Sequence, residues 1–413
     1  MRIFVISNYY PPHYLGGYEL ACYDVVEGLQ RRGHEVAVLT SNYGVSQPTV
    51  HGQAYRRLRL HRYAESQRSL WQFAREQYDA MQYVRRLMRE FQPDMLYLWS
   101  MGFLGHPLIH AVFDIQKQGC PLVFAISDRW MFEGYDQSHH WRDYWRHTPQ
   151  SLIKKMAKRL LKRLLSRFIA VEPLTFSIRY AHFFSQSLRQ QYAQAGIRPY
   201  DARIIYHGVP IPPRRSFQEQ TCAVTKLLYS GRLDPQKGVH TAIEAMAILR
   251  QRGVNHLHLT ILGQAEPSAY VSRLFGLIER NALHDCVSIL HKAPREELGA
   301  IYQTHDALIF PSIWEEPFSI TLLEAMAHGM MIIATTTGGS SEILRDQQNC
   351  LIFEAANADE LARQIEKAIQ NPCVMRALQN NAYHTVQAHY SQEIMLDEIE
   401  QYLLWIVRKA KPI

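Results

Sequence analysis

One short stretch of the sequence holds two carboxylates at a spacing that suits ligand binding. The stretch FPSIWEEPFSITLLEAMAHG, residues 310–329, contains Glu316 and Glu324 with seven residues between them. Residues 307–310 have the pattern of a buried strand, and from about Phe318 apolar residues recur at helical spacing. The N–H groups and dipole of such a helix N-terminus favour an anion such as phosphate, and a nearby carboxylate can accept hydrogen bonds from several hydroxyls. Phosphate plus polyol describes a nucleotide sugar.

The alternative is that both glutamates are surface acids of an amphipathic helix. Glu324, however, falls within an otherwise apolar stretch, residues 322–327. Burying an unpaired carboxylate is costly, so a carboxylate at such a position is normally kept for a ligand or a partner. The pattern therefore favours a binding role for both glutamates, most directly for Glu324.

The segment GRLDPQKG, residues 231–238, supplies the cations that a phosphate ligand needs. It places Arg232 and Lys237 in a glycine-containing loop ahead of a helix. Two cations there can neutralise a diphosphate, both when it binds and when charge develops as it leaves. A solvated loop with a glycine cap is the plain alternative, since short motifs are weak signals, and the glutamate pair shifts the interpretation toward function.

The first half of the chain offers two further candidate sites. Gly16 and Gly17 follow the first strand and open a helix, where residues without a Cβ let backbone N–H groups approach a phosphate or a sugar. Asp128 follows a strand in AISDRWMFEG, residues 125–134, and is placed to orient or deprotonate an acceptor hydroxyl. The alternatives are a tight turn for the glycines and a helix N-cap for Asp128.

Short apolar strands alternate with helical segments along the chain, which is typical of parallel sheets covered on both faces. The predicted fold class is therefore α/β, with two doubly wound, Rossmann-like domains facing each other across a cleft at the carboxyl ends of their strands. The predicted strands are 3–7, 35–40, 95–99, 122–126, 182–185 and 203–206, then 226–229, 258–262, 287–290, 307–310, 331–335 and 350–353. Predicted helices lie between them, for example 18–32, 72–89, 319–328 and 340–344.

The domain boundaries follow from a change in composition. Residues 209–220 contain three prolines followed by polar residues, which predicts a linker between an N-terminal domain, 1–208, and a C-terminal domain, 221–388. The last segment, 389–413, is predicted to be a C-terminal helix.

The formal net charge is +7, and one segment accounts for the excess. Residues 151–168 contain seven Lys or Arg residues and no acid, with apolar residues at helical spacing. This is a basic amphipathic helix, which predicts contact with an anionic membrane surface. The alternative is a domain helix whose apolar face packs inward. Because the excess charge is local, it argues against a nucleic-acid partner wrapping the surface.

The remaining composition narrows the class of protein. The six cysteines are at least 23 positions apart, which excludes CxxC-type metal sites and gives no disulfide framework, so we expect a reducing cytoplasm. The N-terminus lacks the features of a signal peptide, and no run approaches the ~20 apolar residues that cross a bilayer. No D-x-D pattern is present to hold a metal against a diphosphate, so no metal site is predicted.

In combination, these segments resemble family 4 of the retaining glycosyltransferases, which have the GT-B fold. The resemblance rests on the glycine pair, HGV before the linker, SGRLDPQKG, LTILGQ, FPSIWEEPFSITLLEAMAHG and TTTGGSSEIL, and it is strongest over residues 226–355. It implies transfer of a sugar from a nucleoside diphosphate donor to an acceptor hydroxyl, without a metal or cofactor and with the anomeric configuration retained. It also implies that the first domain binds the acceptor, the second binds the donor, and the final helix crosses back onto the first.

The resemblance assigns roles to individual residues. Arg232 and Lys237 would hold the diphosphate, Glu316 the donor sugar and Glu324 the ribose hydroxyls. The predicted catalytic set is Asp128, Glu316, Arg232 and Lys237. Further donor contacts would come from Gly16, Gly17, Gly231, Gly263, Lys292, Phe318 and Ser319.

Two positions depart from the family pattern. Ser127 and Asp128 stand where many members have a histidine near the reacting carbon, so Asp128 is expected to take over the orienting role, and a different acceptor chemistry stays open. His207 stands where asparagine is usual, with little expected consequence.

Retention in such a site needs no nucleophile from the protein. The leaving diphosphate, stabilised by Arg232, Lys237 and helix N–H groups, can accept the proton of the acceptor on the same face of the sugar. The acceptor would be a sugar, a glycan or a lipid-linked sugar, in the synthesis of a polysaccharide, a glycolipid or another glycoconjugate. Two alternatives stay open: a nucleotide-sugar epimerase, and a non-catalytic module that binds a sugar nucleotide on the same fold.

Overall fold

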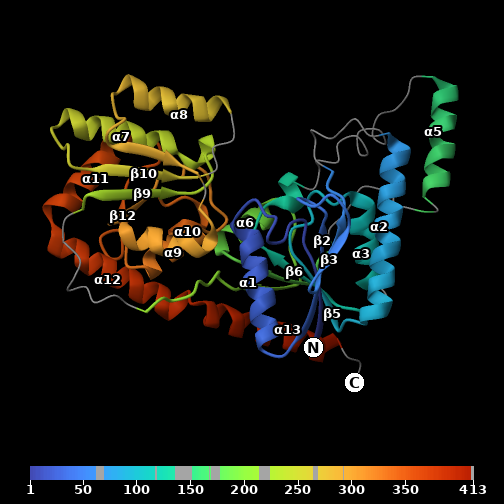
Figure 1. Cartoon of the computed structure of the whole chain (residues 1–413). Coiled ribbons are helices and arrows are strands. Elements are labelled where there is room, and N and C mark those ends of the chain that lie inside the picture. Colours follow the sequence, from blue (N-terminus) through green and yellow to red (C-terminus); the bar gives the residue numbers. More distant parts are fainter. Residues whose placement is uncertain are drawn as a thin grey trace. The chain divides into compact units, whose positions relative to one another are not determined.

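The computed structural model describes residues 1–61, 69–116, 119–134, 151–166, 168, 177–213, 224–263, 268–291 and 293–410. The chain divides into two compact units. Unit 1 comprises Met1–Phe184, Leu188–Ile205 and Leu396–Ile413, and unit 2 comprises Ser185–Ser187 and Tyr206–Met395. Each unit is an α/β domain with a buried apolar core of its own (Figure 1).

The described part of unit 1 is built on one sheet with the strand order β3-β4-β2-β1-β5-β6-β7-β8. The strands are β1 (Arg2–Ile6), β2 (Glu35–Ser41), β3 (Thr49–His51), β4 (Ala54–Leu58), β5 (Met95–Leu98), β6 (Leu122–Ile126), β7 (Tyr180–Phe183) and β8 (Asp201–Ile204). Neighbouring strands are parallel except for β3 and β4, which pair antiparallel at the edge. β5 and β6 are buried along their whole length, as expected for a sheet covered on both faces.

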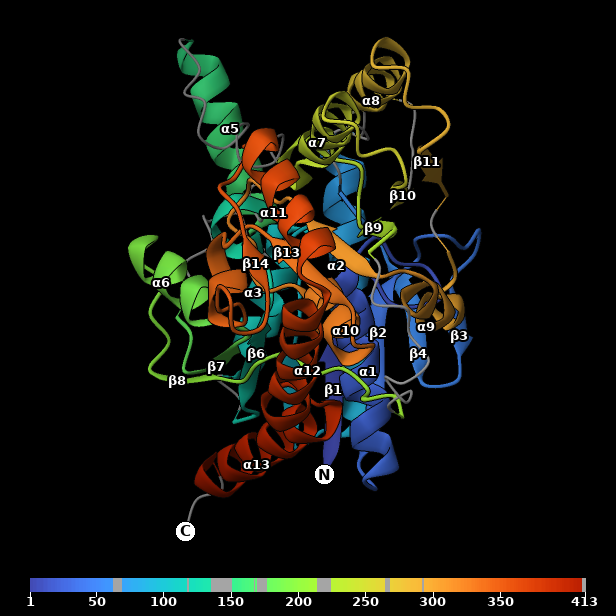
Figure 2. The same ribbon diagram turned by 90° about the vertical axis from the view of Figure 1, so that its left-hand side faces the viewer.

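Helices lie on both faces of this sheet. The helices in this part of the chain are α1 (Gly17–Arg31), α2 (Leu70–Phe91), α3 (His106–Gln116), α5 (Leu152–Leu165), α6 (Gln186–Gln194) and α13 (Gln392–Ala410), with a short π-helix at Trp130–Gly134. α5 stands apart from the sheet (Figure 1). α1 and α13 lie on one side of the sheet, and α2 and α3 lie on the other (Figures 1 and 2). α13 packs closely on α1, because a Cβ on Gly28 would overlap the side chain of Leu396.

Unit 2 has a sheet in which every described pair of neighbours is parallel, in the order β11-β10-β9-β12-β13-β14. Its strands are β9 (Lys226–Ser230), β10 (His258–Leu262), β11 (Val287–Leu290), β12 (Ala307–Phe310), β13 (Met331–Ala334) and β14 (Leu351–Ile352). Its helices are α7 (Val239–Gln251), α8 (Ala269–Arg280), α9 (Arg295–Thr304), α10 (Ile320–Ala327), α11 (Ala358–Gln370) and α12 (Pro372–His389). α7 packs against α8 and α11 on one face, and α10 packs against α12 on the other (Figure 1).

The strand order of unit 2 decides where its functional loops meet. The chain proceeds outward from β9 through β10 to β11, and then returns to β12 on the other side of β9. The loops that follow β9 and β12 therefore leave the same edge of the sheet in opposite directions. Open α/β sheets bind ligands at such a switch point.

The predicted fold class, α/β with two doubly wound Rossmann-like domains, is confirmed, and individual elements differ. β7 and β8 each begin two residues before the predicted strands 182–185 and 203–206, because their registers are set by pairing with β6 and β7. The predicted helix 340–344 is a 3-10 turn over Gly338–Glu342. The prediction lacks the hairpin of β3 and β4, since β3 is fully exposed and shows no apolar alternation.

The first residues of the predicted linker are held in place. Val209 forms a parallel bridge with Ser391. The amide of Val209 donates to the carbonyl oxygen of Tyr390 at 2.9 Å, and its own carbonyl oxygen accepts from the amide of Gln392 at 2.9 Å. Residues 214–220 of the predicted linker lie outside the described residues. The segment that leads into α13 thus runs beside the start of the predicted linker within unit 2.

Candidate active site

The loops after β9 and β12 contact each other at the switch point of unit 2. The amide of Ile313 donates to the carbonyl oxygen of Gln236 at 3.0 Å, which ties the second loop to the first. Gly238 permits this approach, because a Cβ there would overlap the carbonyl oxygen of Pro311. Its φ of +67° is also one that other residues rarely adopt. The glycine is therefore required by packing between the two loops.

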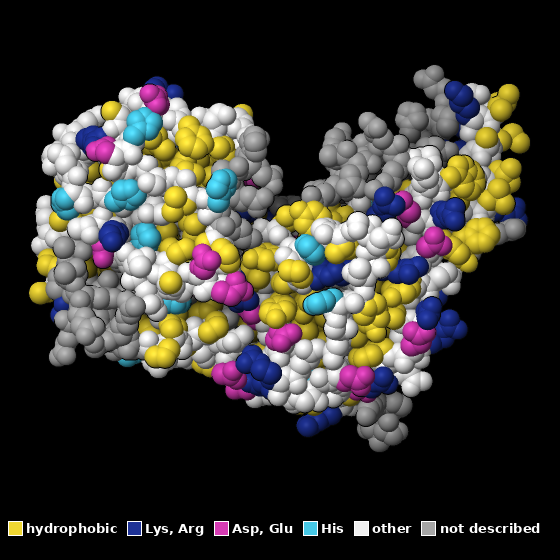
Figure 3. Space-filling view, in the orientation of Figure 1, with side chains coloured by type: hydrophobic (Ala, Val, Ile, Leu, Met, Phe, Trp, Pro, Cys, Tyr) yellow, Lys and Arg dark blue, Asp and Glu magenta, His cyan; other side chains and the backbone are white. Residues whose placement is uncertain are grey.

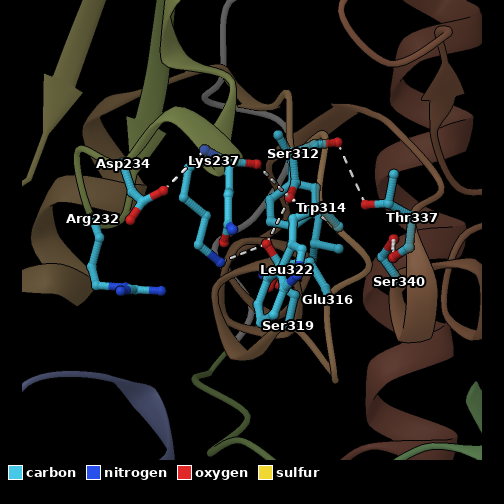
Figure 4. Close-up of polar contacts among 12 residues, drawn as sticks. Arg232, Asp234, Lys237, Ser312, Trp314, Glu316, Ser319, Leu322, Thr337 and Ser340 are labelled. Atoms are coloured by element: carbon cyan, nitrogen blue, oxygen red, sulfur yellow. Dashed lines mark hydrogen bonds and ion pairs between the residues drawn. The ribbon is translucent and has the colours of Figure 1, made fainter. Parts of the chain in front are cut away.

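Lys237 and Glu316 form a short ion pair between these loops (Figure 4). Nζ of Lys237 lies 2.5 Å from Oε1 of Glu316, although the two residues are 79 positions apart in the sequence. The hydroxyl of Ser312 donates to the same carboxylate oxygen at 2.7 Å. Nζ of Lys237 also lies 5.5 Å from the centre of the Trp314 ring, within cation–π range. Within the described residues, Oε2 of Glu316 has no hydrogen-bond partner.

The ion pair is largely removed from water. Glu316 is 4% exposed, and an isolated carboxylate at that depth would be costly to keep charged. Lys237 compensates that charge, and its own side chain is 18% exposed. The exposed side of the ammonium is therefore the part of the pair that a bound anion can reach.

The N-terminus of α10 begins just after Glu316. Ser319 is its N-cap, and the hydroxyl oxygen of Ser319 accepts a hydrogen bond from the amide of Leu322 at 3.3 Å. Across the described part of the chain, the amides of Ile320 and Thr321 have no hydrogen-bond acceptor. Amides at the start of a helix, aligned with its dipole, can bind an anion.

Phe318 anchors the same loop in the interior of unit 2. Its ring centre lies 5.5 Å from that of Tyr206 and 5.9 Å from that of Tyr390. The side chain is buried, so a ligand contact at Phe318 would have to use the backbone.

The loop after β13 supports the Glu316 loop through its backbone. The amide of Gly339 donates to the carbonyl oxygen of Glu316 at 2.7 Å, and the hydroxyl of Thr335 donates to that of Ser312 at 2.6 Å. A Cβ on Gly338 would overlap the backbone of Glu316. These contacts fix the carboxylate before any ligand arrives, so the ion pair is preorganised.

Glu324 lies in the second turn of α10 and is half-buried. The hydroxyl of Tyr302, from α9, donates to Oε2 of Glu324 at 2.8 Å. Burial and the neighbouring carboxylate raise the pKa of Tyr302, which keeps its hydroxyl protonated as a donor. Half-buried and hydrogen-bonded, Glu324 is not a freely solvated surface acid.

Arg232 is the exposed cation of this site. Its carbonyl oxygen accepts a hydrogen bond from the hydroxyl of Tyr229 at 2.7 Å, which holds the loop by its backbone. No hydrogen bond or ion pair with a described residue engages its guanidinium. Figure 4 shows the side chain apart from the pair of Lys237 and Glu316. Its charge is left to solvent, where a ligand can reach it.

Gly231 and Gly263 end the strands β9 and β10 at the same edge of the sheet. The amide of Gly231 donates to the carbonyl oxygen of Leu262 at 3.0 Å, and that of Gly263 donates to the carbonyl oxygen of Leu290 at 3.1 Å. A Cβ on Gly263 would overlap the carbonyl oxygen of Gly231, so close approach of two backbones requires this glycine. The predicted donor contact Lys292 lies outside the described residues.

In unit 1, the predicted glycine pair stands at the N-terminus of α1. Gly16 is the N-cap, and its amide donates to Oε2 of Glu19 at 2.9 Å, while the amide of Leu15 lies 3.4 Å from Oε1. Glu19 is fully buried, and burial raises the pKa of its carboxyl. The amide of Gly16 is thus used by an internal acceptor. That of Gly17 has no acceptor among the described residues.

Asp128 follows β6 at the carboxyl edge of the sheet of unit 1. Its Oδ1 accepts a hydrogen bond from the amide of Trp130 at 3.4 Å, just ahead of the π-helix, in the manner of a cap. Burial and the neighbouring charges of Glu19 and Asp128 raise the pKa of Tyr18, the second residue of α1. A capping contact and a role toward a ligand are compatible at this position.

Two family profiles match this chain. One, described as Glycosyl transferases group 1, matches residues 222–385, and the other, Glycosyltransferase Family 4, matches residues 15–211. The chain is a family 4, group 1 glycosyltransferase. The two profiles fall on the two halves of the molecule. The loops around Lys237 and Glu316, with Glu324, all lie within the first match.

Two proteins with similar sequences are also named as glycosyltransferases. An uncharacterized glycosyltransferase of Methanocaldococcus jannaschii is 25% identical, over 96% of each chain. A D-inositol 3-phosphate glycosyltransferase of Pseudarthrobacter chlorophenolicus is 31% identical, over 35% of this chain and 34% of that protein.

Solved structures resemble the glycosyltransferase over nearly its whole length. Sucrose-phosphate synthase from Thermosynechococcus elongatus has a TM-score of 0.71 and 18% identity, covering 99% of each chain. The HepE protein of Anabaena, in complex with UDP-glucose, has a TM-score of 0.68 and 20% identity, covering 98% of this chain and 99% of that one. At these identities the likeness shows the fold, which is the GT-B fold.

Three partners in these sites were missed by sequence reasoning. Glu19 occupies the third helical position of a capping box, which is a readable pattern. Ser312 follows Pro311 just after the end of β12, and a hydroxyl four residues before Glu316 in a turn is a usable signal. Tyr302 lies in α9, and no spacing in the sequence links it to Glu324.

Two further findings concern the described residues of the glycosyltransferase as a whole. Among them, no helix is long and apolar enough to cross a bilayer. Nor do any three His, Cys, Asp or Glu side chains gather there as a metal site would require. Independence from metal stays a prediction.

Proposed function

We propose that this glycosyltransferase moves a sugar from a nucleoside diphosphate sugar to an acceptor hydroxyl, with retention of the anomeric configuration and without a metal. The observation that carries the proposal is the ion pair of Lys237 and Glu316 beside the N-terminus of α10, with the exposed Arg232 in the same loop as Lys237. Two cations and open amides suit a diphosphate, and carboxylate oxygens suit sugar hydroxyls. The complexes of Anabaena HepE with UDP and with UDP-glucose support a donor of this class.

In the proposed reaction, the bond between C1 of the sugar and the diphosphate oxygen breaks, and the acceptor oxygen bonds to C1 on the same face. The acceptor proton passes to the leaving diphosphate oxygen. Arg232, Lys237 and the amides of Ile320 and Thr321 stabilise the charge that builds on the diphosphate. This preorganised electrostatic stabilisation is the largest catalytic contribution in the proposal.

The glutamates and Asp128 position the reactants. Glu316 offers Oε2 to a hydroxyl of the donor sugar, since both hydrogen bonds that described residues donate to its carboxylate are accepted by Oε1. Glu324 accepts hydrogen bonds from the ribose hydroxyls. Asp128 orients the acceptor hydroxyl from the first domain.

The acceptor class is proposed from relatives. A lipopolysaccharide 1,2-N-acetylglucosaminetransferase of Salmonella typhimurium is 27% identical over 43% of this chain, and an amylovoran biosynthesis glycosyltransferase of Erwinia amylovora is 26% identical over 43%. Both names support an acceptor that is a sugar, a glycan or a lipid-linked sugar in glycoconjugate synthesis. A cytoplasmic location is supported by the described cysteines, all of which are free thiols.

A panel of nucleotide sugars tests the donor assignment. A bound donor raises the unfolding temperature by mass action, so the correct base and sugar should give the largest thermal shift. The donor found in this way is then supplied with candidate acceptors. The product anomer is assigned by NMR, and EDTA treatment tests metal independence.

Arg232→Ala tests the role of the exposed cation. Removing one preorganised donor to the leaving group should lower kcat by about 10²–10³-fold. Arg280→Ala, at an exposed cation of α8, is the matched control and should leave turnover unchanged. Unchanged turnover in both Arg232→Ala and Lys237→Ala would remove the basis of the mechanism.

The two alternatives make different predictions in the same assays. An epimerase converts the donor into a second sugar nucleotide when no acceptor is present, which chromatography detects. A non-catalytic module gives the thermal shift but neither transfer nor hydrolysis.

A further inference from the structure

The helix α5 exposes side chains that a helix of a globular domain normally buries. Leu152 and Ile153 are 77% and 80% exposed, and Met156, Leu160 and Leu164 are exposed as well. Figure 3 shows hydrophobic side chains along α5, at the upper right of the view, with Lys and Arg beside them. The sequence-based alternative, in which the apolar face packs inward, is therefore wrong.

The five exposed side chains form one continuous stripe. Successive residues of an α-helix are about 100° apart, so these five positions fall within an arc of about 120°. α5 has 14 residues, which makes the stripe about 20 Å long. A stripe of this width is what a surface helix normally turns toward an apolar core.

The opposite side of α5 carries lysines and faces the protein. Lys155, Lys158 and Lys162 are partly buried, and Leu165, at the C-terminal end, is 6% exposed. The helix is thus oriented with part of its charged side toward the protein and its apolar stripe outward. Burial within the domain does not explain that orientation, so the stripe fits an apolar partner outside the chain.

The charge of α5 indicates what kind of surface that partner presents. Its 14 residues include six cations and no acid: Lys154, Lys155, Lys158, Arg159, Lys162 and Arg163. By helical position, Arg159 lies just outside one edge of the stripe and Arg163 just inside it. Apolar side chains bordered by cations match the boundary between acyl chains and anionic headgroups.

We propose that α5 is a membrane-docking helix that lies flat in the interface of an anionic bilayer, with its apolar stripe among the acyl chains. The cations at the edge of the stripe then contact headgroup phosphates. This proposal rests on α5 alone and does not depend on the donor or on the reaction.

A second copy of the chain is the competing occupant of the stripe. Two helices packed stripe to stripe would bring Arg159 and Arg163 of each helix to the contact, with no acid in either helix to offset them. An anionic lipid surface neutralises the same cations. The charge pattern therefore favours the membrane.

Vesicle flotation of the full chain tests the proposal. The protein is mixed with vesicles of phosphatidylcholine alone, or of phosphatidylcholine with phosphatidylglycerol. We expect binding to the anionic vesicles to be roughly tenfold stronger or more, and to weaken as salt is added. Equal binding to both kinds of vesicle, or no binding to either, would overturn the proposal.

A paired substitution in the stripe tests which residues dock. The double variant Ile153→Gln with Leu160→Gln removes two exposed apolar side chains and should weaken anionic-vesicle binding by roughly tenfold or more. The matched control is Phe275→Gln with Val374→Gln, which alters two exposed apolar side chains of unit 2 and should bind like the unmodified protein. Unchanged thermal midpoints verify that the variants fold.

A charge variant separates the electrostatic contribution from the apolar one. Lys154→Glu, Arg159→Glu and Arg163→Glu together change three exposed cations, keep the stripe and should abolish the preference for anionic vesicles. Full binding by either this variant or the stripe variant contradicts the proposal. Light scattering gives the other decisive outcome. A dimer that Ile153→Gln with Leu160→Gln dissociates, without any vesicle binding, assigns the stripe to a second copy and overturns membrane docking.

Discussion

Each unit places a buried glutamate beside the N-terminus of a helix at the carboxyl edge of its sheet, but the two glutamates have different partners. In unit 1, Glu19 accepts a hydrogen bond from the backbone amide of Gly16 at the start of α1. In unit 2, Glu316 is paired with the side chain of Lys237 instead. The amides that open α10 are left without an internal acceptor among the described residues.

The difference shows how one fold gives two kinds of helix N-terminus. A carboxylate held on backbone amides occupies the place that an anion would use, and its charge repels a second anion. A carboxylate held by a lysine leaves the amides open and keeps a cation nearby. We therefore expect a diphosphate to bind at α10 in unit 2 rather than at α1 in unit 1.

The largest expected effect comes from breaking the ion pair of unit 2. Lys237→Ala leaves Glu316 buried without its countercharge, which should lower the free energy of unfolding of unit 2 by about 3–5 kcal/mol. Adding Glu316→Gln removes the buried charge and should restore part of that loss, although transfer activity stays low. Urea unfolding of the single and double variants measures both effects.

A control variant tests whether removal of any lysine side chain would lower the stability of unit 2. Lys226→Ala alters an exposed lysine at the start of β9 and should leave the unfolding midpoint unchanged. If Lys237→Ala were as stable as the unmodified protein, the ion pair would not be the feature that distinguishes the two units.

An intermediate effect is expected at Glu324. Glu324→Gln keeps the size of the side chain but removes the charge that the ribose hydroxyls would contact, which should weaken donor binding by about 1.5–3 kcal/mol, or roughly 10–100-fold. The change should appear in the Kd of the donor, measured by calorimetry, more than in kcat.

Tyr302→Phe is the control for Glu324. It removes the internal hydrogen bond to Oε2 and leaves the carboxylate in place. We expect a smaller loss of donor affinity than for Glu324→Gln. A larger loss would mean that the contact with Tyr302, rather than a direct contact with ribose, is what matters.

The smallest expected effect concerns Glu19 and its dependence on pH. Burial raises the pKa of this carboxyl above its ordinary value of 4.5, so the folded state holds the proton more tightly than the unfolded chain. Stability from this group is fully present below that ordinary value and is lost as pH rises through the raised pKa. Between the two pKa values, the free energy of unfolding should fall by at most about 1.4 kcal/mol as the pH rises by one. Glu19→Gln should remove this slope, which thermal unfolding at a series of pH values measures.

Donor affinity gives the matching test in unit 1. Because we expect the diphosphate to bind at the N-terminus of α10 and not at that of α1, Glu19→Gln should change donor affinity far less than Glu324→Gln does. A strong gain in donor affinity would indicate that the charge of Glu19 had been excluding the diphosphate from a second binding position at α1.

The parts of the site that could be predicted from sequence are those with local signals. Arg232 and Lys237 stand in a glycine-containing loop before a helix, and Glu316 and Glu324 stand around a helix start that spacing alone reveals. The alternation of strands and helices likewise gives the fold class. The two loop motifs are each contained within about twenty residues of chain, and the alternation repeats along its whole length.

The features that could not be predicted depend on which elements become neighbours. Ser312 and Lys237 meet at Oε1 of Glu316 only because β12 pairs beside β9. Tyr302 reaches Glu324 only because α9 and α10 come together. For the basic segment 151–168, the exposure of Leu152 and Ile153 contradicts inward packing of the apolar face, and contact with a membrane stays a prediction.

The amino-acid sequence by itself determined the repeating α/β plan, the basic amphipathic character of α5, and the chemical types available at the ends of β9 and β12, since local spacing carries all three. Tertiary structure decided which charges are compensated and which stay open. Lys237 is bound to a buried carboxylate while Arg232 is exposed. Glu19 takes up the amide of Gly16, while those of Ile320 and Thr321 have no acceptor in the part of the chain that the structure describes. The physical reason is that compensation of a charge depends on distances of a few ångströms between residues far apart in the chain, and only strand order and packing set those distances.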